Sequence, residues 1–518
     1  MAASTIRAAT IKPPSLGKGE CAVDHLATMT SGSPSRREFL ALLGAGAAGA
    51  CVAGCSGNRN GASSMPLAGA PFVEPGALTS RAARLEVTLR AEARLVPYGK
   101  GARFAYTYNG STPGPTLRVR PGDRLVITLE NRLDHDTNLH THGLHVSPAV
   151  DDIFLMVPPG HSHSYIYDIP ADHRSGLFWY HPHVHEHVAE QVAAGLAGAI
   201  VVADDLDDIA EMAASTERIW ILADPPIGTT SQILSASGAT RMQGREGDQV
   251  LVNGIRRPRI EAKTGTLERW RLVNASASRY YRFAVDGHPL QIIATDGGRL
   301  VAPVAVNSVL IAPGERVEVV VGPTHAGTYT ARSLAYQRGS AMGMGGGMMG
   351  GRANESATSE TTLATMTVNG TTARAGALPA RLAEPSALAL PTPSATRTVT
   401  LAMGAGGGGG RGMGMMSFTI DGRTFDPSRT DITTRVGVVE EWVIRNASSM
   451  DHPFHLHTWP FQIVGASAEA GWKDTVNVPA NSEIRIRVPF VNFSGRTVYH
   501  CHILDHEDLG MMGVIVIK

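Results

Sequence analysis

One ten-residue pattern occurs three times in the chain: it reads GDRLVITLEN at 122–131, GTLERWRLVN at 265–274 and GVVEEWVIRN at 437–446. Each copy begins with Gly, ends with Asn nine residues later, and alternates apolar with polar residues between them. Such alternation is typical of a half-buried strand that is entered through a glycine turn. The pattern therefore predicts one β-module repeated three times.

Each copy is followed by a second shared stretch, which opens on Gly176, Gly327 and Gly495. Gly and Pro are plentiful, at 57 and 31 residues, which favours a turn-rich β protein over a helical one. At 518 residues the chain is also too long for a single core. We therefore predict an all-β chain of three tandem Greek-key β-sandwich or barrel domains, at 80–205, 206–385 and 390–518, with linker sequence at 377–396.

The first 55 residues have the features of an export signal. SRREFL at 35–40 is a twin-arginine motif, and the small, apolar stretch 41–52 is its hydrophobic region, too short for a membrane span. VAGC at 52–55 resembles a lipobox, so Cys55 is either an acylated amino terminus or part of a cleavage site without lipid; both interpretations stay open. With a flexible spacer at 56–79, we expect a periplasmic or other extracytoplasmic protein, anchored to the membrane if Cys55 is acylated.

Charge and cysteine content narrow the function. Lys+Arg and Asp+Glu balance at 46 each, so no net field favours nucleic acid or an anionic membrane surface as a partner. Cys21 and Cys51 fall in the removed segment, which leaves Cys501 as the one thiol of the mature chain besides Cys55. A single thiol in an exported protein favours a metal-binding or catalytic role.

The placement of the histidines on the repeat indicates metal binding. In the first and third modules, two His-x-His pairs stand at matching places, nine and eleven residues after the Asn of the first stretch and five and seven after the Gly of the second. Alternate residues of a strand share one face, so both rings of a pair point the same way. The middle module has Phe283, Val285, Arg332 and Leu334 at these positions. Eight imidazoles are enough for three metal ions, and imidazole suits copper. They are His140, His142, His181, His183, His455, His457, His500 and His502.

Cys501 lies between two of these histidines, so its side chain points to the opposite face of its strand. His452, His506 and Met511 are close enough in sequence to converge on it. Two His, one Cys and a weak Met ligand define a blue-copper electron-transfer site. The Cys501 backbone would connect this site to the neighbouring histidines by a short covalent path.

The first module provides an internal control. Pro182 and Thr137 stand where the third module has Cys501 and His452, so we predict no second blue site and read His187 as a non-ligand. His145, His161, His163 and His185 also fall outside the repeated positions, and we expect surface or supporting roles for them.

Together these residues are similar to the four copper motifs of the multicopper oxidases, a family that includes laccases, bacterial cuprous oxidases and bilirubin oxidase. The motifs are HTHG at 140–143, HPH at 181–183, HPFHLH at 452–457, and HCH at 500–502 with His506 and Met511; the likeness spans Leu85 to the carboxyl terminus. It implies three cupredoxin domains and four copper ions. The type 1 copper would take His452, Cys501, His506 and Met511; the type 2 copper His140 and His455; and the type 3 pair His142, His181, His183, His457, His500 and His502.

The resemblance also implies the reaction. Electrons would enter singly at the type 1 copper, pass through Cys501, and reduce dioxygen to two waters at the cluster. That reduction needs four protons, and Asp151 and Glu507 resemble in position the acidic residues that the family has near the cluster. Ordinary turn and surface acids are the alternative interpretation of these two residues.

Methionines bear on the substrate, because thioethers favour Cu(I). Bacterial cuprous oxidases carry Met-rich insertions near the type 1 site, and Met450 resembles a substrate-copper ligand there. Ser448 stands where those enzymes have an acidic residue, although Asp451 is near, and this departure weakens the likeness. The Gly/Met-rich tracts contain Met342, Met344, Met348 and Met349, within the insertion 341–351, and Met403, Met413, Met415 and Met416.

We therefore predict an oxidase of Cu(I), of phenols and aromatic amines, or of both, with a role in copper tolerance. The alternatives are a laccase without a role in copper homeostasis and an exported copper-sequestering protein. A copper nitrite reductase lacks this double His-x-His complement, and a metal-free division factor on the same fold would have lost ligands. The physiological reductant and the oligomeric state stay open.

Overall fold

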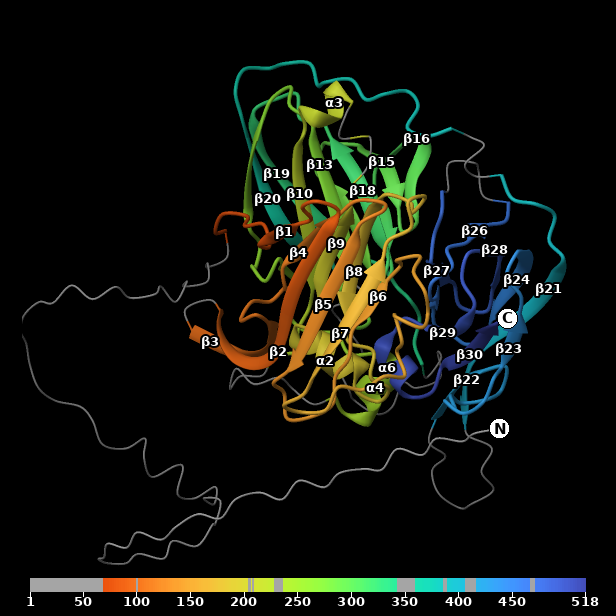
Figure 1. Cartoon of the computed structure of the whole chain (residues 1–518). Coiled ribbons are helices and arrows are strands. Elements are labelled where there is room, and N and C mark those ends of the chain that lie inside the picture. The colour runs from red at the N-terminus through yellow and green to blue at the C-terminus, as the bar shows by residue number, and fades with distance from the viewer. Residues whose placement is uncertain are drawn as a thin grey trace, which may run out of the picture. The chain divides into compact units, whose positions relative to one another are not determined.

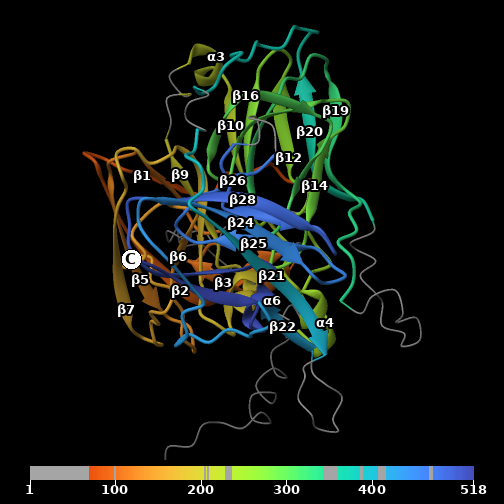
Figure 2. The ribbon, with the colours of Figure 1, turned by 90° about the vertical axis from the view of Figure 1, so that its right-hand side faces the viewer.

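The computed structural model describes residues 69–98, 101–203, 206, 209–227, 236–341, 359–384, 389–405, 416–465 and 471–518. Its elements are mostly strands, arranged in six sheets (Figures 1 and 2). The predicted all-β class is confirmed. The export signal, Cys55, the tract Met342–Met349, and Met413 and Met415 lie outside the described residues. No described helix is both long and apolar enough to span a membrane.

The first module, β1–β9, has two sheets, with strand orders β1-β4-β9-β8-β6 and β3-β2-β5-β7. Buried residues such as Leu89, Ile127 and Tyr165 form its core. The strands are β1 (Ala77–Thr79), β2 (Arg84–Tyr98), β3 (Gly101–Tyr108), β4 (Thr116–Val119), β5 (Arg124–Asn131), β6 (His140–His142), β7 (Ser162–Asp168), β8 (Gly176–His181) and β9 (Gly198–Val202).

The middle module, β10–β20, also has two sheets, ordered β11-β10-β13-β18-β15-β16 and β12-β20-β19-β14-β17. Trp220, Trp270 and Phe283 belong to its core. The strands are β10 (Thr216–Ala223), β11 (Leu251–Val252), β12 (Arg259–Lys263), β13 (Glu268–Asn274), β14 (Tyr281–Val285), β15 (Leu290–Thr295), β16 (Gly298–Val306), β17 (Val309–Ile311), β18 (Arg316–Val321), β19 (Gly327–Leu334) and β20 (Thr361–Asn369).

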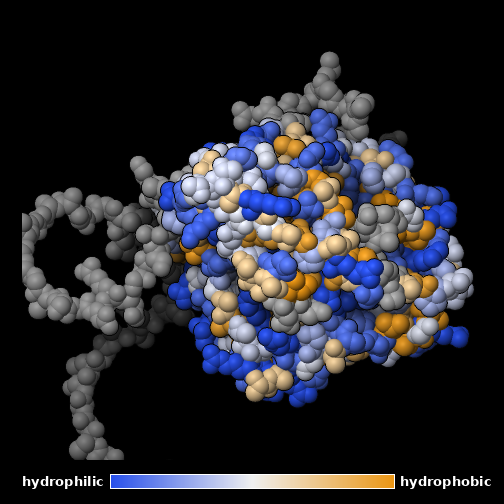
Figure 3. Space-filling view, turned by 90° about the horizontal axis from the view of Figure 1, so that it is seen from above, coloured by the Kyte–Doolittle hydropathy of each residue, from blue (hydrophilic) through white to orange (hydrophobic). Residues whose placement is uncertain are grey.

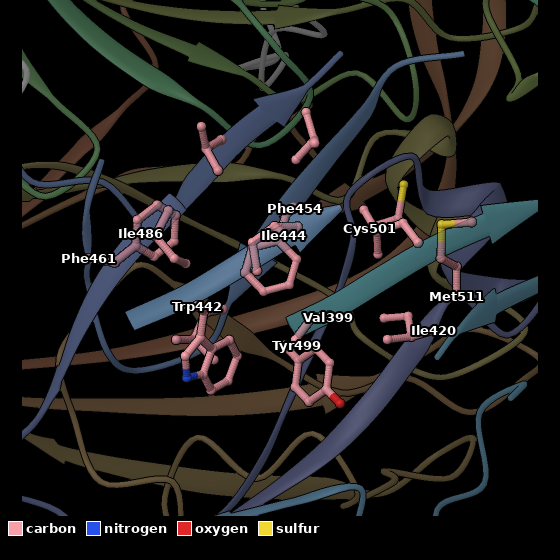
Figure 4. Packing of buried hydrophobic residues seen from close by; sticks show 14 of the residues in the cluster. Val399, Ile420, Trp442, Ile444, Phe454, Phe461, Ile486, Tyr499, Cys501 and Met511 are labelled. Carbon is pink, nitrogen blue, oxygen red and sulfur yellow. The ribbon is translucent and has the colours of Figure 1, made fainter. Parts of the chain in front are cut away.

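The third module, β21–β30, has sheets ordered β22-β21-β24-β28-β26 and β23-β30-β29-β25-β27. Figure 4 shows its core, in which Trp442, Phe454 and Tyr499 pack together and Cys501 and Met511 lie at one end. The strands are β21 (Ala395–Ala405), β22 (Met416–Ile420), β23 (Ile432–Thr434), β24 (Val438–Asn446), β25 (His452–Leu456), β26 (Gln462–Ile463), β27 (Thr475–Val478), β28 (Glu483–Phe490), β29 (Gly495–Cys501) and β30 (Met512–Ile517).

Short helices lie between the strands: α2 (Val188–Ala194), α3 (Ala210–Ala213), α4 (Gly238–Gln243) and α6 (Leu504–Asp508). On the face that Figure 3 shows, hydrophobic residues form small groups separated by hydrophilic ones. The residue boundaries of the three domains stay a prediction.

The repeated ten-residue pattern forms β5, β13 and β24, which hold the same place in each module. Each pairs in parallel with one long strand (β2, β10 or β21) and antiparallel with another (β7, β18 or β28). The Asn that ends each copy of the pattern holds neighbouring loops in place. The Nδ2 groups of Asn131, Asn274 and Asn446 each donate two or more hydrogen bonds to backbone carbonyls of loops farther along the chain. In the first and third modules this side chain fixes the loop that leads to the first His-x-His pair.

Candidate metal centre

The His-x-His pairs lie on, or at the ends of, neighbouring antiparallel strands. On β6 and β8, His140 is opposite His181, and on β25 and β29, His455 is opposite His500. Strand pairing therefore gathers four rings in each module. All eight histidines have at most 1% of their surface exposed.

The two modules place these rings against each other with approximate twofold symmetry. His140 stacks on His457 with ring centres 3.9 Å apart, and His142 stacks on His455 at 3.8 Å. Exchanging the two modules converts one contact into the other. The edge contacts of His183 with His500 and of His181 with His502 are related in the same way. The structure thus brings all eight sequence-predicted histidines into one cluster.

The ring nitrogens show that this cluster fits metal ions. The Nδ1 atoms of His140, His181 and His455 lie 2.7, 2.8 and 2.9 Å from oxygens of Asp151, Pro182 and Asp474. Each Nδ1 can therefore carry the proton and donate outward, which leaves the lone pair on Nε2. These three Nε2 atoms are buried and have no partner among the described residues. Buried lone pairs without donors are costly, and a cation satisfies them.

The charge state agrees with this fit. Burial lowers the pKa of His183 to about 3, and it holds the pKa values of His181, His457 and His500 well below the usual range. These four rings are therefore neutral near pH 7, as ligands must be. Three sets of ring nitrogens each lie within 4.8 Å of one another, so the cluster has room for more than one ion. The sets are His140/His455/His457, His140/His142/His181 and His183/His457/His500.

A second group lies on the other face of β29. The Cys501 sulfur is 3.3 Å from His452 Nδ1 and 3.8 Å from His506 Nδ1, and these two nitrogens are 3.4 Å apart. Ser448 Oγ lies 2.7 Å from His452 Nε2, and the carbonyl oxygen of Met242 accepts from His506 Nε2 at 3.0 Å. These outer contacts leave both Nδ1 lone pairs facing the sulfur.

The sulfur chemistry of this group also suits a soft metal. Burial raises the pKa of the Cys501 thiol, so a bound cation is what would make it a thiolate. Met511 is fully buried in the same core, and Figure 4 shows its side chain beside Cys501. The Met511 carbonyl accepts from the Cys501 amide at 3.1 Å, and its amide donates to the His506 carbonyl at 2.9 Å. Met450, two residues before His452, is fully buried as well.

Both predicted acidic residues lie at the cluster. Asp151 is 3% exposed, contacts His140 and accepts from the Thr141 amide at 2.8 Å. Glu507 is fully buried on α6, with one carboxylate oxygen 3.3 Å from His183 Nε2 and the other 3.0 Å from His500 Nδ1. Burial raises the pKa of Glu507. Neither residue is a surface acid, although Asp151 follows directly after the turn at 148–150.

The middle module contributes to the site although it has no histidine at the repeated positions, and this contribution was not predicted from the sequence. Asp474 Oδ1 lies 3.1 Å from His142 Nε2, and its carboxylate takes a bidentate pair of hydrogen bonds from Arg316, at the start of β18. Asp296, also in the middle module, accepts from the Arg316 amide at 2.6 Å. Two charged residues, Arg316 and Glu318, in an otherwise apolar strand are the one hint of this contribution in the sequence.

The histidines outside the repeat do not join either group. The side chain of His187 is 44% exposed and lies near Glu190. His145 instead connects the first and third modules, with its Nδ1 2.9 Å from the Thr458 carbonyl and its Nε2 3.1 Å from Asn492 Nδ2.

Gly314 offers a test of how tightly the middle module packs on the cluster. Its φ is +83°, and an added Cβ would lie 2.7 Å from the His502 ring. We expect Gly314→Ala to cost about 1–3 kcal/mol of stability through the backbone conformation, and also to lower the copper content of the cluster while the blue absorption persists. Gly422→Ala is the control, because Gly422 has φ +75° with nothing within 4 Å of the added Cβ. Equal copper contents in the two variants would contradict this prediction.

Comparison with known proteins gives a consistent result. Models of multicopper oxidase domains match residues 91–207, 226–370 and 397–518. A multicopper oxidase of Staphylococcus haemolyticus is 30% identical over 445 residues, which are 83% of this chain and 87% of that protein. The solved structure of a Campylobacter jejuni multicopper oxidase, described as a metallo-oxidase, has a TM-score of 0.77 at 30% identity, covering 88% of this chain and 96% of its own.

A cell division protein, FtsP of Xenorhabdus nematophila, is also 27% identical, over 94% of this chain and 99% of its own length. Overall likeness therefore does not by itself separate a division protein from an oxidase. The two His/Cys groups identify this chain as an oxidase, because every residue of the four copper motifs is present and buried. The chain belongs to the multicopper oxidase family, and it is a cupredoxin-fold, copper-dependent oxidoreductase that uses dioxygen.

Proposed function

We propose that the protein oxidises its substrate one electron at a time at a type 1 copper and reduces dioxygen by four electrons at a type 2/type 3 cluster of three coppers. His452, Cys501, His506 and Met511 would hold the first. The eight paired histidines would hold the other three, His140 and His455 the type 2 ion and the remaining six the type 3 pair. The observation that carries this proposal is that β29 places Cys501 in one group and His500 in the other, and that His502, directly after the strand, contacts the rings of the second group.

The protein's part in electron transfer is a short, rigid connection. Cys501 is covalently continuous with both neighbouring histidines, and its own carbonyl lies 3.1 Å from His500 Nδ1. The path therefore has a covalent branch and a hydrogen-bonded branch, both fully buried. Burial excludes water and keeps the ligand geometry fixed.

The protein's part in proton supply falls to Glu507 and Asp151. Glu507 lies between His183 and His500, and burial favours its protonated form, so it can hold a proton beside the cluster. Asp151 contacts the outer nitrogen of His140 and would hold that ring in place. Dioxygen reduction consumes four protons, so replacing Glu507 should slow it.

Cu(I) is the substrate that the surroundings of Cys501 favour. Both imidazoles of that site are fully buried, and Ser448 and Met242 occupy their outer nitrogens, so a bulky phenol cannot touch a ring edge. Met242, Met403 and Met416 are partly buried and pack against the core that contains Cys501. Thioethers bind Cu(I), and the similar Campylobacter jejuni protein is described as a metallo-oxidase.

Ser448 stands where bacterial cuprous oxidases have an acidic residue, and the nearby Asp451 does not take over that position. Its carboxylate accepts hydrogen bonds from Tyr336 at 2.5 Å, Asn477 at 3.0 Å and the Ala480 amide at 2.9 Å. We therefore assign Cu(I) capture to the methionines. A role in copper tolerance and export by the twin-arginine route are parts of the same proposal, supported by the methionines and the signal motif. Whether Cys55 is an acylated anchor or part of a cleavage site without lipid stays open.

Oxygen uptake driven by Cu(I) and by a small phenol tests the substrate. We expect Met403→Leu/Met416→Leu to reduce kcat/KM for Cu(I) by about tenfold, roughly 1.4 kcal/mol, and deletion of 342–349 to do the same, while uptake with the phenol is maintained. Met156→Leu, an exposed methionine of the first module, is the control. Unchanged Cu(I) kinetics in both variants would favour a laccase without a role in copper homeostasis. Colourless protein that binds Cu(I) and consumes no oxygen would favour a sequestering protein.

A further inference from the structure

A small cavity lies between the first and middle modules, with room for the centres of one or two water-sized molecules. Arg103, Thr112 and Gly195 line it from the first module, and Ile221, Asp224 and Ser276 line it from the middle module. None of its lining residues belongs to the histidine cluster or to the Cys501 site. The remaining wall is mostly alanine, valine, leucine and proline.

Arg103, on β3, is the unusual member of this wall. It is 2% exposed, its Nε has no hydrogen-bond partner, and its one hydrogen bond to a described residue runs from Nη1 to the Phe104 carbonyl at 3.3 Å. No carboxylate of the described chain lies within ion-pair distance of it. Burial lowers the pKa of Arg103 to about 10, so the guanidinium is still charged at neutral pH.

Other buried arginines of the molecule are paired, which makes Arg103 an exception. Arg269, Arg279, Arg316 and Arg338 each contact a buried carboxylate at 2.5–2.9 Å. A buried charge normally persists only when it is paired and hydrogen-bonded. The guanidinium of Arg103 therefore lacks the counter-ion that its burial requires.

The other polar groups of the cavity do not supply that counter-ion. Asp224 is already neutralised by Arg279, at 2.7 Å, and accepts from the Gly247 amide at 3.0 Å. Thr112 Oγ1 donates to the Gly195 carbonyl, and the Ser276 hydroxyl lies 2.7 Å from that of Tyr281. The unsatisfied group on this wall is a single positive charge with a free donor.

We propose that the cavity binds one small monovalent anion, a halide or a short carboxylate, on the Arg103 guanidinium. A guanidinium presents a planar set of N–H donors that suits such an anion. Because the walls come from two modules, the bound anion links the first module to the middle one. Binding to the folded state alone stabilises the protein by mass action.

Thermal unfolding of the full-length, copper-loaded protein tests this site. Chloride or formate is titrated while gluconate, which is too large for the site, keeps the ionic strength constant. We expect a saturable rise in Tm of about 3 °C that Arg103→Met abolishes and Arg103→Lys partly retains. The control is Arg445→Met, an exposed arginine of the third module, which should keep the full rise. Oxygen uptake is not used, because halides also bind copper.

Crystals soaked in bromide provide a second, direct measurement. The expected result is an anomalous peak beside Arg103 in the wild type and none in Arg103→Met. A Tm rise of equal size in the wild type and Arg103→Met, no rise in the wild type, or an empty cavity in bromide would overturn the proposal. If Arg103→Met does not fold, the wild-type titration and the bromide map still decide the question.

Discussion

Cys501→Ser should abolish the blue colour and reduce oxygen uptake with every one-electron donor by more than about 100-fold. This effect is larger than the roughly 10–100-fold loss of activity that follows when a metal ligand loses a supporting hydrogen bond. Serine offers a hard, protonated oxygen where the site has a soft sulfur within 3.3–3.8 Å of two ring nitrogens. Without the thiolate, neither the absorption nor the tight site can form. His500 lies on the other face of β29 and the ring of His502 contacts His142 and His181, so the cluster should keep its copper.

The measurements are visible absorption, elemental analysis and oxygen uptake on one preparation. We expect one copper fewer per chain in Cys501→Ser than in the wild type. Met511→Leu is the matched control, since it alters the same buried site but retains the sulfur of Cys501; it should stay blue with a shifted potential. A blue Cys501→Ser protein, or one with unchanged copper content, would contradict the assignment of this site.

Strand periodicity explains why so much of the site could be predicted from the sequence. The alternation of side chains on a strand determines which residues share a face, so His-Cys-His at 500–502 had to present its thiol opposite its rings. The repeated pattern also identified β5, β13 and β24 in advance. The role of its final Asn was not predicted, because the loops that Asn131 and Asn446 fix have no periodic signal.

What the sequence could not predict depends on contacts between distant segments. Arg316 and Asp474 are 158 residues apart, and nothing in either stretch indicates that they pair. Met242 lies on the short helix α4, and no sequence pattern indicates that its carbonyl accepts a hydrogen bond from His506. The position of Glu507 between His183 and His500 likewise depends on how the first and third modules meet.

The middle module thus has a part in the site without providing a ligand. Arg316 is 1% exposed and donates to Asp474, to the Asp296 carbonyl at 2.9 Å and to the Leu177 carbonyl at 3.2 Å. Asp474 in turn contacts His142 and accepts from His455 through its carbonyl. One guanidinium therefore connects all three modules beside the cluster.

Arg316→Met should therefore cost about 3–5 kcal/mol of stability, as breaking a buried ion pair does, and should also deplete the cluster of copper. Burial raises the pKa of Asp474, yet Arg316 and its other contacts hold it well below the usual range. Without the guanidinium, Asp474 is left buried and uncompensated, and the carboxylate moves or takes up a proton. His142 and His455 then lose the group that orients them, whereas the Cys501 site is unaffected.

Arg269→Met separates this effect from general destabilisation, because Arg269 is equally buried and pairs with Glu318 at 2.8 Å, a residue that contacts no histidine of the cluster. Denaturant unfolding should show a smaller loss for Arg269→Met, because Arg271 still pairs with Glu318. Elemental analysis should find cluster copper lost only from Arg316→Met, with the blue absorption intact in both. Asp474→Asn should reproduce the copper loss. The double variant with Arg316→Met should lose little more copper than either single variant, because both changes act through one carboxylate. If Arg316→Met retains all its copper, the middle module supports only the fold, and the orientation of His142 must come from Thr475, whose Oγ1 is 3.2 Å from the same nitrogen.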